Sequence, residues 1–473
     1  MLYVKKLVVD HNLMLIGPSS GGLQGFYHGV LWYYILAIPF IIGNGNPAAL
    51  TLFMAVCSTA SILLTYFILK KIANNGAALI GTVIYSFAGF SIATSRFIWN
   101  PYPIVWIMPL YFYALHSAVN KKQYALPLAA FLTSLMIHFE VVYGLTLIPT
   151  LILLTCKYLK QWKILAFSLF LFLIPVSPYI LFDLRHNFQI STVILQTIST
   201  GGANLSHAAA DKATAPFERV LLRLDDLYSY TAMSLSPSLY LNGTIMIILV
   251  FIVLKLRKRS DQKEEFKFIL LVVATVVIPF FLFLTLKYAV WGYYWIGNPA
   301  LFTLLAAFIV GKIPAVIPNK SNIILGLIIL VMLVTYNPLQ YFPTWKNGTI
   351  GQGTQTLSTQ RAVVATILRE TQKDPYSVYV LTPPVYDYVY RYLFQWQASQ
   401  TLQNYPLDHK QQTIYLVLEP SASDPQAEYF KKKVIRTEEI AVKKWNFAGS
   451  LQLEKIITGK NESNVDSNVL PVL

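Results

Sequence analysis

The sequence predicts an α-helical protein that crosses a membrane many times and ends in a small α/β domain. Hydrophobic residues make up 55% of its 473 residues and charged residues only 12%, whereas a soluble domain carries about 25% charged residues. Apolar runs recur at short intervals, each near the roughly 20 residues with which a helix crosses the hydrocarbon layer of a bilayer. After Tyr336 the pattern changes to short alternating segments that are typical of strands and helices.

The first 46 residues hold one apolar stretch, at 26–43, that is a poor candidate for a span. Gly29 and Pro39 interrupt it and leave a short apolar core, which favours a helix lying along the outer surface or re-entering the membrane. The alternative is that 26–43 is itself a span, with the N-terminus inside. The preceding GPSSGG stretch lacks the residues that complete a phosphate-binding loop, so its local pattern predicts a flexible turn.

The transmembrane part is predicted to run from 47 to 337. The segments 124–138 and 141–156 are short, so we expect a hairpin with HFEVVYG near its outer tip; one longer interrupted segment is the alternative. About ten helices are expected, at 47–69, 77–95, 101–119, 124–138, 141–156, 163–183, 239–257, 267–287, 294–312 and 321–337.

The net charge of +15 indicates orientation in the membrane and not a nucleic-acid partner. The most basic connector, Lys255–Lys267, should face the cytoplasm, because positive residues gather on that side. Counting crossings from it places four other groups of lysines on the same side: Lys70/Lys71, Lys121/Lys122, Lys157/Lys160/Lys163 and Lys312/Lys320. The opposite, outer side receives the N-terminal stretch, SRFIWNPYP, the long loop at about 184–238, LKYAVWGYYWIGNP and the C-terminal domain.

The C-terminal α/β domain is expected at 338–458, followed by a disordered tail at 459–473. Helices are predicted at LSTQRAVVATILRETQ and VYDYVYRYLFQW, and strands at SVYVLTPP, TIYLVLEP, KKKVIRTEEI and SLQLEKIIT. The domain contains no nucleotide-binding motif, so no nucleotide chemistry is assigned to it.

Four outer segments carry the candidate site residues, and each has a structural alternative. His28 could hydrogen-bond a sugar or phosphate, or be an interfacial histidine without a chemical task. Arg96 could pair with a phosphate, or simply extend to the membrane surface. Glu140 is interpreted as a substrate-facing polar group, because HxE alone is a weak metal signal.

The fourth outer segment, FDLRHNF, carries three ionisable groups together at the outer end of the 163–183 span. Asp183, Arg185 and His186 are interpreted as stabilising a leaving phosphate, since three such groups at a membrane boundary are costly without a task. The alternative is an Asp183–Arg185 ion pair that anchors the end of a helix.

These segments together resemble a known family. LIGPSSGGLQGFYHGVLWYYILAIPF, SRFIWNP and PYILFDLRHNF, in this order, resemble the bacterial membrane glycosyltransferases of the dolichyl-phosphate-mannose–protein mannosyltransferase type (glycosyltransferase family 39-like). The resemblance covers most of residues 10–300 and implies the GT-C fold, with 1–46 as the remainder of the first external loop. That family's catalytic acid follows a first transmembrane helix, and this sequence begins too late to contain either. The expectation is a chain that is shortened at its N-terminus or no longer catalytic, and no catalytic residue is assigned.

The resemblance also implies an activity, namely transfer of a hexose or pentose from a polyprenyl-phosphate donor on the outer face of the plasma membrane. Arg96, Arg185 and His186 would face the phosphate, while His28 and Asn100 would contact the sugar or the lipid headgroup. The expected partners are the polyprenyl-phosphate-linked sugar, the bilayer and an acceptor that is a glycan, lipid or protein. No cofactor is assigned, and a divalent metal is left open. The alternatives are a non-catalytic relative and a transporter or flippase of lipid-linked glycans.

Overall fold

The computed structural model describes residues 1–19, 25–200, 215–234, 238–286, 290–312, 356–371, 374–382, 387–401, 405–419, 424–459 and 470. The chain divides into two compact units. Unit 1 comprises Met1–Val9, Asn44–Asn46 and Gln340–Leu473, and unit 2 comprises Asp10–Gly43 and Pro47–Leu339. The division differs from the predicted boundaries, because parts of the segment 1–46 belong to the same unit as the C-terminal domain.

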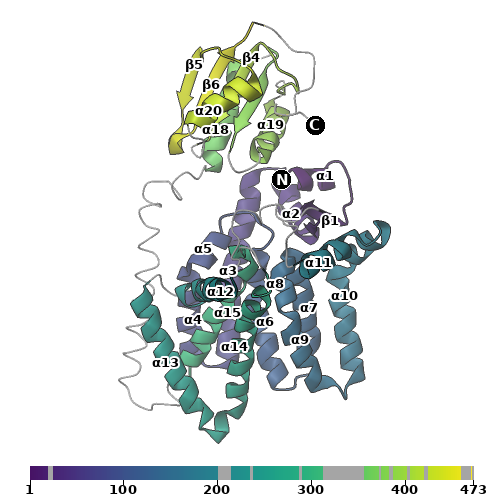
Figure 1. Cartoon of the computed structure of the whole chain (residues 1–473), viewed down its shortest axis with the longest axis vertical. Helices are drawn as coiled ribbons and strands as arrows, with labels where there is room; N and C mark the ends of the chain where they lie inside the picture. The colour runs from purple at the N-terminus through teal and green to yellow at the C-terminus, as the bar shows by residue number, and fades with distance from the viewer. Residues whose placement is uncertain are drawn as a thin grey trace. The chain divides into compact units, whose positions relative to one another are not determined.

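Unit 2 is a bundle of helices with a small hairpin of two strands (Figure 1). Its elements are β1 (Ile16–Ser19), β2 (Tyr27–Gly29), α2 (Leu31–Ile42), α3 (Pro47–Ile72), α4 (Asn75–Phe87), α5 (Gly89–Thr94), α6 (Pro103–Val119), α7 (Ala125–Phe139), α8 (Val141–Thr146), α9 (Ile148–Thr155), η1 (Cys156–Tyr158), α10 (Trp162–Arg185), α11 (Gln189–Ser199), α12 (Pro216–Ser229), η2 (Ala232–Ser234), α13 (Leu239–Arg257), η3 (Ser260–Gln262), α14 (Lys263–Phe283), η4 (Gly292–Trp295) and α15 (Asn298–Val310).

Apolar helices make up most of unit 2. In the described ranges, five helical segments are long and apolar enough to cross a membrane: Pro47–Ile72, Val141–Tyr158, Trp162–Arg185, Ser260–Phe283 and Gly292–Val310. Four shorter apolar helices, α2, α4, α6 and α7, accompany them. Nine of the expected spans therefore fall on helices, and the tenth, 321–337, lies outside the described residues.

The backbone leaves the helical region at two points, one inside the predicted span 77–95 and one between the predicted spans 124–138 and 141–156. Ala88 is extended and separates α4 from α5. Glu140 is extended as well, at φ −145° and ψ 103°, and separates α7 from α8. Because α7 packs against both α8 and α9, the two halves form the predicted hairpin and not one interrupted segment.

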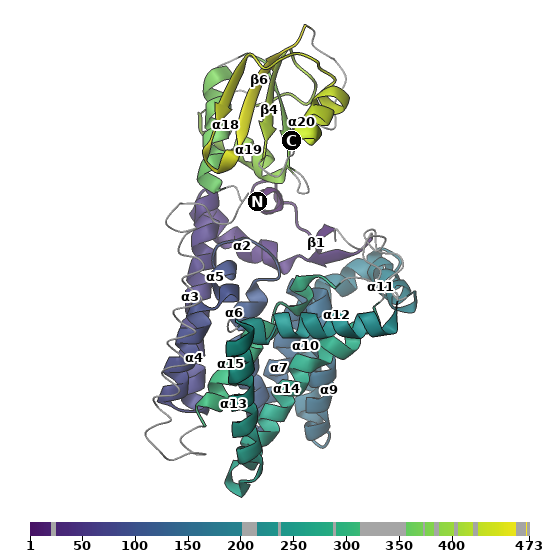
Figure 2. The same cartoon turned by 60° about the vertical axis from the view of Figure 1, so that its left-hand side comes forward.

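Three elements of unit 2 were not expected. GPSSGG was predicted as a flexible turn, but Ile16–Ser19 is a strand that pairs antiparallel with Tyr27–Gly29. The loop predicted at 184–238 contains two helices, α11 and α12, in its described part. Figure 2 shows both lying across the end of the bundle, and α12 is strongly amphipathic, as a surface helix should be.

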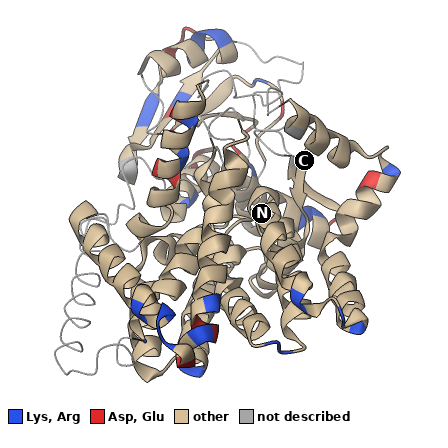
Figure 3. Ribbon diagram, turned by 60° about the horizontal axis from the view of Figure 1, so that its bottom comes forward, with Lys and Arg blue, Asp and Glu red and all other residues tan. Residues whose placement is uncertain are grey.

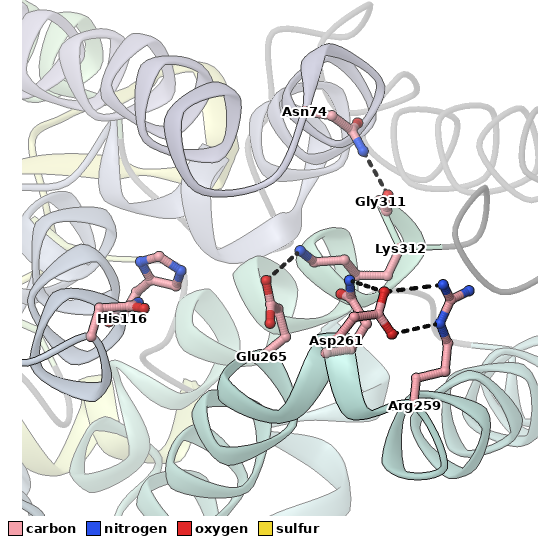
Figure 4. A network of polar contacts seen from close by, with 9 residues as sticks. Asn74, His116, Arg259, Asp261, Glu265, Gly311 and Lys312 are labelled. Carbon is pink, nitrogen blue, oxygen red and sulfur yellow. Dashed lines mark hydrogen bonds and ion pairs between the residues drawn. The ribbon is translucent and has the colours of Figure 1, made fainter.

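The basic loops gather at one end of unit 2, as the counting of crossings requires. Figure 3 shows blue and red ribbon mostly at helix ends, with tan along the helices. The Lys312 ammonium group lies 3.4 Å from a Glu265 carboxylate oxygen, and Arg259 pairs with Asp261 at 3.0 Å (Figure 4). On an adjoining helix, Asn74 donates to the Gly311 carbonyl oxygen over 2.6 Å.

Unit 1 is built on a four-stranded sheet of order β3-β4-β6-β5. β3 and β4 are parallel, whereas β6 runs antiparallel to both β4 and β5. The elements are α1 (Leu2–Val8), α18 (Leu357–Thr371), β3 (Ser377–Leu381), α19 (Tyr388–Thr401), β4 (Thr413–Leu418), α20 (Asp424–Tyr429), η5 (Phe430–Ile435), β5 (Lys443–Asn446), η6 (Ala448–Ser450) and β6 (Gln452–Ile457).

One predicted strand of unit 1 was wrong. KKKVIRTEEI begins inside η5, a π-helical turn, and the strand β5 lies further on, at Lys443–Asn446. The helix is favoured because Ala427, Phe430 and Ile435 then contact the same core cluster under the sheet. A strand would turn alternate residues, including lysines, toward that core.

The N-terminal helix and a short connector complete unit 1. α1 packs against α19, burying Val4 and Leu7, and Lys5 donates to the Gln395 side-chain oxygen over 2.9 Å. The same face of α19 holds the connector 44–46, because Tyr392 donates to the Gly45 carbonyl oxygen and Trp396 donates to that of Asn44.

Candidate functional site

A cavity of about 270 Å³ lies in unit 2 beside the extended break at Glu140. Almost all of its lining is apolar, and the polar groups at its edge are Tyr179, Asp183 and Ser191. Its walls come from α7, α8, α10 and α11, together with Phe26 just before β2. The segments FYHG, IHFEVVYG and FDLRHNF, which lie far apart in the sequence, therefore meet at one cavity.

Asp183 orders the wall of this cavity by capping α11. The backbone N–H groups of Ile190 and Ser191 donate to its two carboxylate oxygens over 2.7 and 3.0 Å, and the Ser191 hydroxyl donates over 2.5 Å. These bonds satisfy donors that the first turn of a helix would otherwise leave without partners. The predicted alternative of an Asp183–Arg185 ion pair is wrong, since the Asp183 carboxylate is engaged by α11 and no such pair occurs among the described residues.

Arg185 and His186 follow at the end of α10, and both are exposed. The His186 ring stacks on Phe182 with centroids 4.0 Å apart, and its Nδ1 lies 2.8 Å from the Phe182 carbonyl oxygen. Asn187 and Phe188 then adopt left-handed φ values of 52° and 57°, which turn the chain into α11. His186 is thus held in place, while the Arg185 side chain is accessible to solvent or to a headgroup.

His28 stands on β2 above the α7 helix end. Burial lowers the pKa of His28 to about 4, so the imidazole is neutral at pH 7, and its buried Nδ1 has no hydrogen-bond partner. The next residue, Gly29, touches His138 so closely that a Cβ there would lie 2.2 Å from the His138 carbonyl oxygen. His138 Nε2 in turn accepts the Leu31 N–H over 2.7 Å, which fixes the start of α2 to α7.

Glu140 is the most deeply buried carboxylate of this end of unit 2. Its side chain is only 2% exposed, and its Oε2 atom has no hydrogen-bond partner. Two phenols interact electrostatically with it, Tyr179 from α10 and Tyr293 from η4. The hydroxyl of Tyr179 is also buried without a partner. Unsatisfied buried polar groups are rare and cost free energy, so this group is a strong candidate for binding a ligand.

Arg96 and Asn100 lie in the loop between α5 and α6. Arg96 is exposed, and like Arg185 and His186 it is not among the residues that line the cavity. Asn100 is partly buried and follows Trp99, whose ring lies 5.3 Å from that of Tyr293. Asp183 lines the cavity and Asn100 does not.

Sequence reasoning noted His138 only as part of the weak HxE signal, and it missed two residues of this site, Tyr179 and Tyr293. Tyr179 had a usable signal, because it lies one helical turn before Asp183 and so shares its face of the helix. Tyr293 had none, since only the fold brings its loop next to Trp99. As for metals, the described residues contain no group of three or more His, Cys, Asp or Glu side chains that could hold an ion.

Similarity to known proteins is found in the fold and not in the sequence. No protein-family model matches the sequence, and no curated protein matches it. The crystal structure of ArnT from Cupriavidus metallidurans bound to undecaprenyl phosphate is similar, with a TM-score of 0.56 and 10% identity over 96% of this chain and 92% of that one. The apo structure of the same protein gives a TM-score of 0.54 and 10% identity, over 96% of this chain and 91% of that chain.

The fold expected from the sequence resemblance is therefore confirmed. ArnT is a GT-C protein, and the likeness spans nearly the whole of both chains. This chain is a multi-pass membrane protein with the GT-C fold of membrane glycosyltransferases.

Proposed function

We propose that the chain is a glycosyltransferase that moves a sugar from a polyprenyl-phosphate donor to an acceptor on the outer face of the plasma membrane. The observation that carries the proposal is the apolar cavity beside the break between α7 and α8, whose lining includes the buried, unpartnered hydroxyl of Tyr179. A polyprenyl phosphate needs that combination, and pockets of this kind are the usual ligand sites of proteins. The similar ArnT structure is bound to undecaprenyl phosphate, which supports the same class of lipid here.

The proposed roles follow from charge and position. Arg185, with His186 beside it, would face the lipid phosphate, and Arg96 would meet it from the loop after α5. A guanidinium group suits this task because it is always charged and can donate two hydrogen bonds to one phosphate. Asp183 would contribute indirectly, by holding α11 against the cavity.

The uncharged part of the donor would meet the remaining groups. His28 is neutral, so it suits hydrogen bonds to sugar hydroxyls or the headgroup better than charge pairing. Asn100 would make similar contacts, and Glu140 would accept hydrogen bonds from the sugar hydroxyl groups. Lipid phosphate is a fair leaving group, so positioning and nearby positive charge should provide most of the rate enhancement.

Transfer from a panel of radiolabelled hexosyl and pentosyl polyprenyl phosphates in proteoliposomes tests the proposal. The wild type is expected to transfer at least one sugar to glycan, lipid or protein acceptors, and Arg185→Ala should reduce the rate about 100-fold, as loss of a charge-stabilising donor does elsewhere. Arg259→Ala, at the basic end of the bundle, is the matched control and should retain activity. Unchanged turnover in Arg185→Ala would remove that residue from the site.

The same proteoliposomes distinguish the two alternatives. A non-catalytic relative would bind the lipid without transferring any sugar of the panel. A transporter or flippase would move a labelled lipid-linked sugar between the leaflets without breaking the bond between sugar and phosphate.

A further inference from the structure

A cluster of aromatic rings reaches Glu140 through Tyr293, which interacts electrostatically with the Glu140 carboxyl group. Two loops that are nearly 200 residues apart in the sequence supply the cluster, and we call it the aromatic platform. Its members are Phe97, Trp99, Tyr102, Trp291, Tyr293 and Tyr294.

The rings of the platform form a continuous set of contacts. Trp99 lies 5.3 Å from both Tyr102 and Tyr293, edge to face in each case. Trp291 stacks near Tyr293 at 6.2 Å with only 20° between the ring planes. The packing fixes each ring by its neighbours, so the platform presents a preformed surface and not a set of independent side chains.

The platform is accessible to a ligand. Trp291 is 49% exposed, and Trp99, Tyr102 and Tyr293 are all partly exposed. Half-exposed aromatic residues at the end of a membrane bundle have a general explanation, because tryptophan and tyrosine anchor proteins at the lipid–water interface. That explanation does not account for Glu140, a buried carboxyl group that interacts with Tyr293 and has one oxygen without a hydrogen-bond partner.

Glu140 connects the platform to the proposed lipid site. Tyr179 lines the cavity and interacts electrostatically with Glu140, and Tyr293 of the platform interacts with the same carboxyl group. The α8 segment that follows Glu140 also packs against η4, which carries Tyr293. The cavity and the platform therefore share Glu140 as a neighbour. In a polyprenyl-phosphate sugar, the sugar likewise lies just one phosphate away from the lipid.

A sugar ring suits such a surface on chemical grounds. One face of a pyranose presents polarised C–H bonds, which pack favourably on the negative face of an aromatic ring. Its hydroxyl groups need hydrogen-bond partners, and a buried carboxyl group with an unpaired oxygen can provide one.

We propose that Trp99 and Tyr293 bind the sugar ring of the lipid-linked donor, with Glu140 hydrogen-bonded to one of its hydroxyl groups. This inference rests on the proposed function, because it assumes that the donor's lipid occupies the cavity. It assigns recognition of the sugar to the loops that follow α5 and precede α15, and leaves the phosphate to Arg96, Arg185 and His186.

The test measures binding, so it does not depend on turnover. The probes are citronellyl phosphate, a short soluble lipid phosphate, and its glucosyl, galactosyl, mannosyl and arabinosyl esters, titrated into the protein in nanodiscs by calorimetry. The wild type is expected to bind at least one sugar-bearing probe more tightly than citronellyl phosphate. Trp99→Ala should weaken binding of that probe about tenfold while leaving the affinity for citronellyl phosphate unchanged.

Two variants control for loss of structure. Trp99→Phe keeps an aromatic face and should recover most of the sugar-dependent affinity. Trp162→Ala removes a tryptophan that is 70% exposed at the start of α10, near the basic end, and should change nothing.

The outcomes separate this inference from the proposed function. If Trp99→Ala keeps the full difference in affinity between the sugar-bearing probe and citronellyl phosphate, the platform does not bind the sugar and is an interfacial anchor. Equal weakening of both probes in Trp99→Ala would also overturn the inference, since the residue would then support the lipid site. A wild type that binds no probe at all, citronellyl phosphate included, would contradict the proposed function itself.

Discussion

Single residues decide how closely the motif segments approach one another. Gly29 is the sharpest case, because its lack of a side chain lets β2 lie directly on His138. Gly29→Ala would bring a Cβ within 2.4 Å of the His138 ring, and overpacking of this kind destabilises by about 1–3 kcal/mol. We expect a lower Tm in a thermal melt of the purified protein.

Gly243 provides the matched control for this substitution. It lies in the α13 helix, and a Cβ there would meet no atom within 4 Å. Gly243→Ala should therefore leave the Tm unchanged or raise it slightly, because alanine is the better helix former. An equal decrease in Tm in Gly29→Ala and Gly243→Ala would show that the contact with His138 is unimportant.

At the same scale, Glu454 makes the stability of unit 1 dependent on pH. Burial alone would raise the pKa of the Glu454 carboxyl, but Lys431 and Lys444, at 2.5 and 2.7 Å, outweigh burial and lower its pKa below the ordinary 4.5. A carboxylate with a lowered pKa in the folded state stabilises the protein above pH 4.5, and that stability is lost as the pH falls through the folded-state pKa.

Glu454→Gln should therefore lower the stability of unit 1 at pH 7 and reduce its sensitivity to acid. Hydrogen exchange of the β6 amides between pH 7 and pH 3 measures both effects. Glu438→Gln is the control, because Glu438 is exposed and should change neither. Acid sensitivity that is identical in Glu454→Gln and the wild type would assign the effect to another group.

At the scale of elements, α11 depends on its cap. Asp183→Ala removes the acceptor for two backbone N–H groups and one hydroxyl, and loss of such a cap costs about 0.5–2 kcal/mol. The α11 amides should then exchange several-fold faster with deuterium, while Arg185→Ala, at the end of the preceding helix, should leave them unchanged. Equal protection in Asp183→Ala and the wild type would show that packing alone holds α11.

The apolar periodicity of the sequence was enough to predict most elements. The long runs predicted α3, α10 and α14 because little besides a helix can satisfy the backbone of 20 apolar residues. In unit 1, β3 and β4 were predicted for a similar reason, since SVYVL and TIYLVL are short, β-branched and nearly all buried.

The elements that sequence reasoning missed depend on contacts between distant segments. β1 contains Gly17 and Pro18, which disfavour a strand, and it is extended because β2 pairs with it. α11 begins only after two left-handed residues and is capped by Asp183 from another helix. No local pattern encodes such a partner, so a loop was the natural prediction.

The candidate site likewise contains residues that the sequence could indicate and residues that only the fold reveals. Glu140 and Asp183 could be singled out because carboxylates are scarce in an apolar chain, and both lie at the end of the bundle opposite the basic loops. Their neighbours Tyr179 and Tyr293 are two of 30 tyrosines, and only the packing of α10 and η4 around Glu140 distinguishes them.

For the whole molecule, the gathering of basic loops at one end predicts its orientation. In a background in which Cys57 and Cys156 are replaced by serine, Asn187→Cys should react with a membrane-impermeant maleimide in intact cells. Lys160→Cys should react only after the cells are opened, because the basic end faces the cytoplasm. Both positions are exposed, so access to the thiol is comparable. The reverse labelling pattern would place the candidate site inside the cell.

The route of the chain through unit 1 has a consequence for the hairpin and α2. The chain leaves unit 1 after Val9 and returns to it at Asn44, where side chains of α19 hydrogen-bond to the backbone of Asn44 and Gly45. Residues 10–43 are therefore a loop whose two ends are both held by unit 1. Holding the ends together restricts the conformations that the loop can adopt, so less conformational entropy is lost when the loop orders. Melting of the sheet domain would release both ends of this loop at once, while the contacts of Gly29 and Leu31 with His138 would still hold its middle to α7.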